Sequence, residues 1–233
     1  MTLERIKQRL FNYTYNFHEY VLYKNIKVEL QKQALATTTE YVRKNVLNVN
    51  SVKTRFEVMD KAISTISIEK GLVLEFGVWR GDSINYIAKK LPNEKVYGFD
   101  SFEGLPEMWR DGMDKNTFQI SYKEFKNLRF LDNVVLVKGH FDETLSTFFK
   151  TNYLPIKFMH VDADLYSSAK TIFKGAYDLI VHGSVIVFDE FFNYPNWENG
   201  EYKAFSEFIN EKNLEFKFIT YNHKQEQVAI KII

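Results

Sequence analysis

The sequence predicts an α/β fold built on a mostly parallel β-sheet, and three features of the chain predict it. Residues 72–100 read as a strand, a glycine turn, a helix and a second strand, the first half of a nucleotide-binding sheet. Further apolar runs follow, separated by the helical patterns that parallel neighbours need as crossovers. The last two apolar runs, 216–220 and 228–232, are joined by a turn too short for a helix, so we expect them to form an antiparallel pair.

The glycine turn indicates what the first strand pair binds. The first strand ends on Glu75, Gly77 and Gly81 follow, and the second strand ends on Asp100. Glycines let the backbone approach a ligand, and the helix that starts there offers free N–H groups. A carboxylate at the tip of the second strand suits the hydroxyls of a ribose.

The spacing Glu75-x-Gly77-x-x-x-Gly81 is looser than the three-glycine turn that binds a pyrophosphate. A looser turn beside an acidic residue suits a ligand that has no phosphates and carries a positively charged amino-acid end. S-adenosylmethionine is such a ligand, whereas a nicotinamide-dependent dehydrogenase is disfavoured because the phosphate-binding turn is missing.

The spacing of apolar residues and the positions of glycine and proline predict the remaining helices and strands. Further strands are expected at 134–137, 158–161 and 185–188, and helices at 121–130, 143–149, 168–180 and 202–211. Residues 1–70 contain neither glycine nor proline and are expected to form helices at 3–13 and 30–47 and a third that Ser51 caps. We therefore expect a helical N-terminal extension, 1–70, and a sheet domain, 71–233. The extension either covers a sheet edge or a dimer surface, or closes over the cofactor with Thr54 and Arg55 as contacts.

Composition excludes several classes of protein. The 233 residues are 45% hydrophobic with a net charge of +1, which gives a sizeable core and no electrostatic footprint for nucleic acid or an anionic membrane. The chain has no cysteine, so it contains no disulfide, thiolate nucleophile or thiolate metal ligand. Its apolar runs are too short to span a membrane, and a cytoplasmic protein is expected.

Acidic residues follow two strands at the edge where an open α/β sheet binds its ligands. Asp162 and Asp164 come after one strand, and Asp189 and Glu190 come after the next. Four carboxylates would repel one another, so we expect a divalent cation, Mg²⁺ first and Mn²⁺ next, with Asp162, Asp189 and Glu190 as ligands. The alternative for Asp164 is that it only caps the helix that follows it.

Four motifs together resemble the macrocin O-methyltransferase family. They are Glu75-Phe-Gly-Val-Trp-Arg-Gly-Asp-Ser83, Gly98-Phe-Asp-Ser-Phe-Glu-Gly-Leu-Pro106, Asp162-Ala-Asp-Leu-Tyr-Ser-Ser168, and Val187-Phe-Asp-Glu190 with Asn193-Tyr-Pro-x-Trp197. The resemblance covers about residues 70–210. It implies a Rossmann-like class I methyltransferase that has a seven-stranded, mostly parallel sheet with an antiparallel last strand and helices on both faces. It also implies S-adenosylmethionine- and metal-dependent O-methylation of sugar hydroxyls on natural products, with the three metal carboxylates on Asp162, Asp189 and Glu190.

The expected cofactor contacts come from four strand ends. Glu75 either faces the cofactor's ammonium or is a buried strand-end carboxylate, and Ser83 either binds the cofactor's carboxylate or caps the helix. Asp100 binds the ribose, and Phe102 either flanks the adenine or belongs to the core. The complete expected set is Glu75, Phe76, Gly77, Gly81, Ser83, Asp100, Ser101, Phe102, Gly139, His140, Phe141 and Asp162.

The general base and the acceptor pocket are less well defined by sequence. Some family members place a histidine three residues after the first metal ligand, but this chain has Leu165 there, so Asp162 or Asp164 is the expected base. His160 alternates with Asp162 along its strand and is more typical of a core histidine. Four aromatic residues either wall the pocket of a small-molecule or saccharide acceptor or pack in the core: Trp109, Tyr166, Tyr194 and Trp197.

Two rival functions remain at this level. One keeps the cofactor and metal but methylates a catechol-type phenol, and the other is a cofactor-binding protein that does no chemistry. Aromatic residues on the N-terminal helices would suit a homodimer.

Overall fold

The computed structural model describes residues 3–17, 25–46 and 48–233. Its contacts divide the chain into two compact units. The first comprises the described residues before Asn48 together with Asn193–Asn196, and the second comprises Asn48–Phe192 and Trp197–Ile233. Among the described helices, none is long and apolar enough to cross a bilayer.

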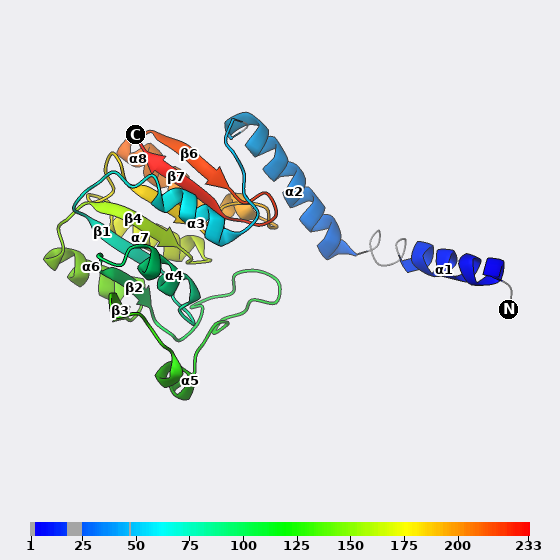
Figure 1. Ribbon diagram of the computed structural model, residues 1–233, viewed down its shortest axis with the longest axis horizontal. Coiled ribbons are helices and arrows are strands. Elements are labelled where there is room, and N and C mark those ends of the chain that lie inside the picture. Colours follow the sequence, from blue (N-terminus) through cyan, green and yellow to red (C-terminus); the bar gives the residue numbers. More distant parts are fainter. Residues whose placement is uncertain (1–2, 18–24, 47) are drawn as a thin grey trace. The chain divides into compact units, whose positions relative to one another are not determined.

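A seven-stranded sheet forms the centre of the second unit, in the order β3-β2-β1-β4-β5-β7-β6 (Figure 1). The strands are β1 (Leu72–Phe76), β2 (Val96–Asp100), β3 (Val134–Lys138), β4 (Ile156–Val161), β5 (Val185–Phe188), β6 (Phe216–Tyr221) and β7 (Val228–Ile232). Neighbouring strands are parallel from β3 to β5, and β7 is antiparallel to both β5 and β6. The predicted mostly parallel sheet with a reversed last strand is confirmed.

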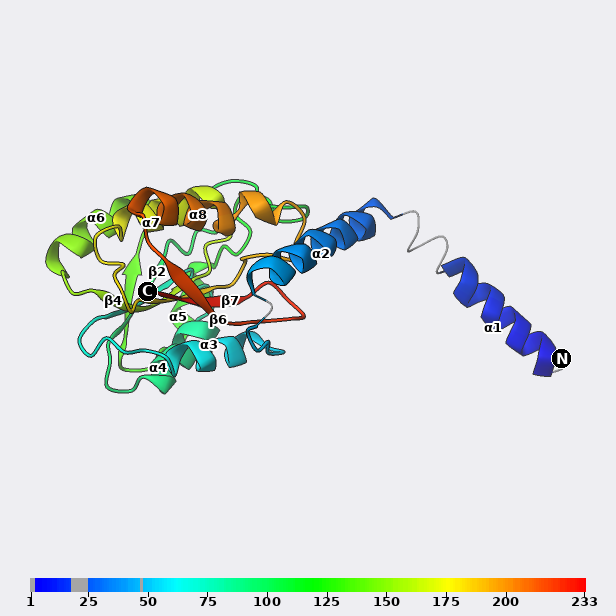
Figure 2. The ribbon, with the colours of Figure 1, turned by 90° about the horizontal axis from the view of Figure 1, so that it is seen from above.

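Helices cover both faces of this sheet. The helices of the second unit are α3 (Arg55–Ile63), α4 (Asp82–Lys90), α5 (Tyr122–Asn127), α6 (Phe141–Thr151), α7 (Tyr166–Gly175) and α8 (Glu201–Lys212), with a short 3₁₀ helix, η2 (Trp197–Asn199). Figure 2 shows α6, α7 and α8 on one face and α3 and α4 on the other. Strand β4 lies between β1 and β5 and is buried along its whole length, which explains its mostly apolar sequence and buries Lys157 and His160 with it.

The first unit contains α1 (Leu3–Phe17) and α2 (Ile26–Asn45). Asn25 caps α2, since its side chain accepts a hydrogen bond from the N–H of Lys27. The segment 193–196 belongs to this unit because Asn193 is bound twice to α2. Its carbonyl accepts a hydrogen bond from Gln31 over 2.7 Å, and its N–H donates to Thr38 Oγ1 over 2.9 Å.

Several predicted helix boundaries were wrong. The first helix ends at Phe17 rather than at residue 13, the second begins at Ile26 rather than at residue 30, and the helix expected over 121–130 ends at Asn127. The third helix is capped by Thr54 rather than Ser51, because Thr54 and Glu57 form a reciprocal capping box. The helix predicted to run to residue 180 ends at Gly175. Leu47, the predicted end of the second helix, lies outside the described residues. Residues 48–70 pack with the sheet through α3, and the domain boundary at residue 70 stays a prediction.

Gly77 joins β1 to the turn at the sheet edge. Among the glycines, it is the one whose replacement by a larger residue would cause the closest steric clash. Its φ is +93°, and a Cβ there would collide with the backbone carbonyl of Asp162 at the end of β4. Two strand ends therefore approach each other at a point where only glycine fits.

Replacing Gly77 with Ala should lower the free energy of unfolding by about 2–4 kcal/mol, from backbone strain and forced displacement of β4 together. Gly112→Ala is the matched control, because Gly112 has a φ of +81° but no atom within 4 Å of a Cβ. It should lose only about 1 kcal/mol. Chemical denaturation measures both, and equal losses in the two variants would contradict the predicted collision.

Candidate functional site

A cavity of about 580 Å³ opens at the carboxyl ends of the parallel strands. The predicted site residues that line it are Gly77, Asp100, Ser101, Trp109, Gly139, His140, Phe141, Asp162, Asp164, Asp189 and Glu190. They come from the ends of β1 to β5 or the loops that follow, the edge at which an open α/β sheet binds ligands.

Asp100 organises the glycine turn. One of its carboxylate oxygens accepts the N–H groups of Val78 and Trp79, over 2.8 and 2.7 Å, and the other accepts the N–H of Phe102 over 2.6 Å. An ionised carboxylate has about four acceptor positions, so one remains for a ligand in the cavity. Asp100 therefore ties the turn after β1 to the loop after β2 and still faces the cavity.

Several residues expected to contact a cofactor do not line the cavity. Phe76 stacks on Phe99 with ring centroids 5.0 Å apart, and Phe102 packs on the ring of Phe125 at 4.8 Å. Ser83 is buried in the first turn of α4, and Gly81 is the N-cap of that helix. Phe76 and Phe102 thus belong to the core, and Gly81 and Ser83 form the start of α4.

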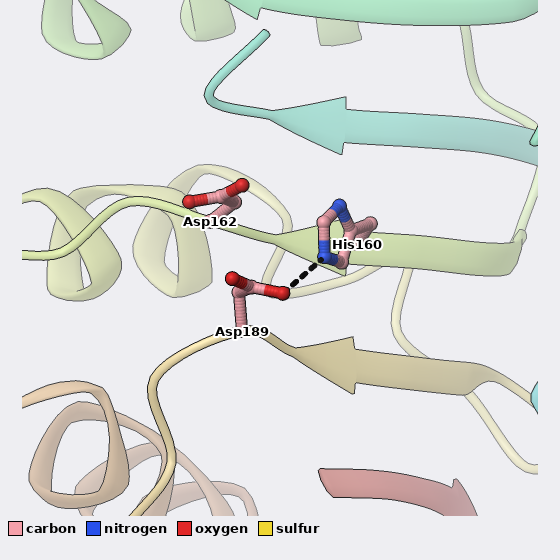
Figure 3. Close-up of side chains that lie close together, drawn as sticks. All are labelled: His160, Asp162 and Asp189. Atoms are coloured by element: carbon pink, nitrogen blue, oxygen red, sulfur yellow. Dashed lines mark ion pairs between the residues drawn. The ribbon is translucent and has the colours of Figure 1, made fainter. Parts of the chain in front are cut away.

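A buried polar chain runs beneath the cavity across three neighbouring strands. Glu75 on β1 and His160 on β4 are both fully buried, and Glu75 Oε1 lies 2.8 Å from His160 Nδ1. His160 Nε2 faces Asp189 Oδ1, which follows β5, over 3.6 Å (Figure 3). Sequence reasoning treated Glu75 and His160 separately; the register that pairs them across β1 and β4 brings their side chains together.

Burial and charge act in opposite directions along this chain. Burial raises the pKa of Glu75, against the opposing effect of His160. Burial also lowers the pKa of His160, but the nearby carboxylates of Asp189 and Glu75 outweigh this and raise that pKa to about 10. For Asp189, burial raises the pKa, and the pairing with His160 and the charge of Arg55 bring it below its ordinary value.

The acidic residues after β4 and β5 form two overlapping groups. Carboxylate oxygens of Asp162, Asp164 and Glu190 lie within 4.8 Å of one another, and so do ligand atoms of His160, Asp162 and Asp189. The expected metal ligands Asp162, Asp189 and Glu190 are therefore joined through Asp162, although they do not form one group by themselves.

The chemistry of these donors fits a divalent cation. Burial first, then neighbouring negative charge, raises the pKa of Asp162 and of Glu190 well above their ordinary values. Glu190 Oε2 and Asp189 Oδ1 are buried and have no hydrogen-bond partner among the described residues. Unpartnered buried oxygens around an acidic cavity are the environment in which Mg²⁺ or Mn²⁺ binds.

Sequence analysis missed three residues that shape the site. Glu201, fully buried at the start of α8, accepts the N–H of Ala163 over 2.9 Å and so holds the loop between Asp162 and Asp164. Arg110, from the loop after β2, lines the cavity and binds Glu226 before β7 over 3.0 Å. A spacing rule such as the capping box relates only residues close in sequence, so it could not find these contacts.

The four aromatic residues expected around an acceptor differ in position. Trp109 lines the cavity, and the guanidinium of Arg110 lies 3.8 Å from its ring centroid. Tyr166 donates its hydroxyl to Glu207 over 2.7 Å, and Trp197 is buried against Tyr202. Tyr194 is buried and belongs to the first unit.

Comparison with known proteins places the chain among methyltransferases. A family model for macrocin-O-methyltransferase matches residues 4–223. The fold is similar to that of CalS11, a calicheamicin methyltransferase and TDP-rhamnose 3'-O-methyltransferase, with 19% identity over 89% of this chain and 93% of that chain and a TM-score of 0.64. It is also similar to the O-methyltransferase NovP, with 22% identity over 76% of each chain and a TM-score of 0.57.

An O-methyltransferase from Bacillus cereus in complex with SAH shares 17% identity over 94% of this chain and 96% of that chain, with a TM-score of 0.51. At these identities the likeness establishes a common Rossmann-like methyltransferase fold. Among curated proteins, none matches the chain significantly in sequence.

The raised carboxylate pKa values predict how stability depends on pH when metal is removed. Burial raises the pKa of Asp164 to about 7, so between pH 4 and pH 7 the folded chain holds a proton that the unfolded chain has lost. The melting temperature in EDTA should therefore fall as the pH rises through this window. Asp164→Asn should flatten the fall, while substitution of an exposed carboxylate, Glu211→Gln, should leave it unchanged. An Asp164→Asn variant with the slope of the parent would contradict the assignment.

Proposed function

The chain belongs to the macrocin O-methyltransferase family, and we propose that it transfers the methyl group of S-adenosylmethionine to a hydroxyl of a sugar or glycosylated natural product with the help of a divalent cation. The observation that carries this proposal is that one cavity joins the glycine turn and Asp100 to the acidic residues after β4 and β5. A nucleoside donor and a metal-bound acceptor could then meet inside it.

The donor would lie at the β1–β3 side of the cavity. Asp100 retains one acceptor position for a ribose hydroxyl, and the methionine part would lie beside Gly77, which lines the cavity after β1. Ser101, Gly139, His140 and Phe141 line the part that an adenine would occupy. Glu75 would act from below the turn, because it is fully buried and does not line the cavity.

The cation would be held at the β4–β5 side by Asp162, Asp189 and Glu190, as Mg²⁺ or Mn²⁺. When bound, such an ion lowers the pKa of a coordinated hydroxyl and fixes its direction. The buried unpartnered oxygens of Asp189 and Glu190 support this assignment.

Methyl transfer requires alignment and removal of one proton. The methyl carbon leaves the sulfonium sulfur as the acceptor oxygen bonds to it, and the hydroxyl proton passes to a carboxylate. Holding donor and acceptor in line can contribute about 7–11 kcal/mol in favourable cases. Asp164 is the favoured base, because it lines the cavity and its carboxylate lies close to the proposed metal ligands Asp162 and Glu190. Asp162 is the alternative.

The relatives support a sugar acceptor. CalS11 acts on TDP-rhamnose, and NovP is likewise an O-methyltransferase. Trp109 offers an aromatic face in the cavity on which a sugar ring could stack. A catechol-type phenol could bind the same carboxylates through the cation, and a direct assay distinguishes this acceptor from a sugar.

Methyl-labelled S-adenosylmethionine is incubated with a panel of glycosides and with a panel of catechols. The glycosides should receive at least ten times as much label as the catechols. The assay is run with Mg²⁺, with Mn²⁺ and with EDTA, and EDTA should abolish the transfer. Preferential labelling of catechols would favour the phenol alternative, and binding of S-adenosylhomocysteine without any transfer would favour a non-catalytic protein.

Two variants should each lose a different property: one should lose cofactor affinity, and the other should lose turnover. Asp100→Ala should weaken S-adenosylhomocysteine binding at least tenfold in calorimetry, since it removes the ribose acceptor and frees three backbone N–H groups of the turn. Asp189→Ala should keep that affinity within about threefold and lose at least 100-fold in turnover. Equal losses of cofactor affinity in both variants would contradict two separate subsites.

A further inference from the structure

His160 has one ring nitrogen with a close partner and one without. Nδ1 lies 2.8 Å from Glu75 Oε1, a normal hydrogen-bond distance. Nε2 is buried, and no hydrogen-bond partner is found for it among the described residues. Its nearest charged neighbour, Asp189 Oδ1, lies 3.6 Å away, too far for a hydrogen bond, and is itself unpartnered.

The difference between the two ring nitrogens is unexpected if Glu75, His160 and Asp189 only stabilise the fold. A histidine that merely balanced two carboxylates would close on both, because an unmade buried hydrogen bond costs about 1–3 kcal/mol. Here the Glu75 side is closed and the Asp189 side is open. The open side faces Asp162 and Asp189, which line the cavity (Figure 3).

The side chains of His160, Asp162 and Asp189 have nearly the spacing of metal ligands. Ligand atoms of His160, Asp162 and Asp189 all lie within 4.8 Å of one another. Nitrogen and oxygen ligands lie about 2.0–2.2 Å from a transition-metal ion, so two of them are separated by at most about 4.4 Å. A shift of a few tenths of an ångström would therefore suffice for all three to reach one ion.

We propose that His160 is a direct ligand of the cation through Nε2, together with Asp162 and Asp189, and that the ion is Mn²⁺ or another first-row transition metal rather than Mg²⁺. The proposal rests on the proposed function in that it concerns the same ion. It adds a nitrogen ligand to a set that sequence analysis limited to carboxylates, and it changes the metal that the site prefers.

Two chemical arguments support the metal preference. Imidazole binds first-row transition metals well, whereas Mg²⁺ prefers oxygen ligands and keeps much of its water. Histidine ligands of metals usually donate their other ring N–H to a carboxylate, which fixes the ring and the tautomer. Glu75 occupies that position behind His160. Coordination needs Nε2 without its proton, and the cation would then replace that proton as the positive charge beside Asp189.

Pulsed electron paramagnetic resonance of Mn²⁺ tests the proposal without an acceptor substrate. Mn²⁺ is added at substoichiometric amount to chelator-treated protein with S-adenosylhomocysteine, and ¹⁴N modulation of the Mn²⁺ echo is recorded. A coordinated imidazole gives this modulation, and a site made only of oxygens does not. The proposal predicts ¹⁴N modulation in the unsubstituted protein and its loss in His160→Gln.

The matched control is His182→Gln, which removes an exposed histidine and should keep the modulation. Calorimetry should also show that His160→Gln weakens Mn²⁺ at least tenfold and Mg²⁺ by less than threefold. S-adenosylhomocysteine affinity reports whether the variant is folded. If it is not, the result for the unsubstituted protein alone decides.

The outcomes separate this inference from the proposed function. Bound Mn²⁺ without ¹⁴N modulation would overturn the ligand role of His160 and leave an oxygen-only metal site intact. Protein that binds S-adenosylhomocysteine but no Mn²⁺ or Mg²⁺ would overturn both. Modulation that persists in His160→Gln would assign the nitrogen to another residue and overturn the inference.

Discussion

The structure depends most on the burial of negative charge at one edge of the sheet. Asp162, Asp164, Asp189 and Glu190 gather where β4 and β5 end, and burial raises the pKa of three of them. A buried carboxylate without a partner loses several kcal/mol of solvation. The positive charges of Arg55, Arg110 and His160 offset part of this cost. A bound cation would offset more of it and would also do chemistry.

The elements around this edge bury the carboxylates and fix the loops that carry them. Glu201 fixes the loop after β4 through the N–H of Ala163. Asp100 ties the glycine turn to the loop after β2, and that loop reaches across to Glu226 through Arg110. Gly77 allows β1 and β4 to end side by side. The donor half and the acidic half of the cavity are thus built from the same few strand ends.

Much of this arrangement could be predicted from sequence, because parallel strands bring their carboxyl ends to one edge. The apolar runs located the strands, and the residue after each run gave Asp100, Asp162, Asp189 and Glu190. Glu201 and Arg110 could not be found in this way, since they reach the site from a helix and a loop distant in sequence. The sequence identified His160 as a core histidine but not its contact with Glu75, because that contact depends on the register of β1 against β4.

The central claim is that the carboxylates at the ends of β4 and β5 hold one cation beside a bound donor. A crystal structure with Mn²⁺ and S-adenosylhomocysteine tests it most directly, with diffraction data collected at the manganese absorption edge to locate the ion by its anomalous signal. The account predicts one anomalous peak about 2.1–2.3 Å from oxygens of both Asp162 and Asp189, with the donor's sulfur facing the same cavity. A bound donor with no anomalous peak between these two residues would contradict it.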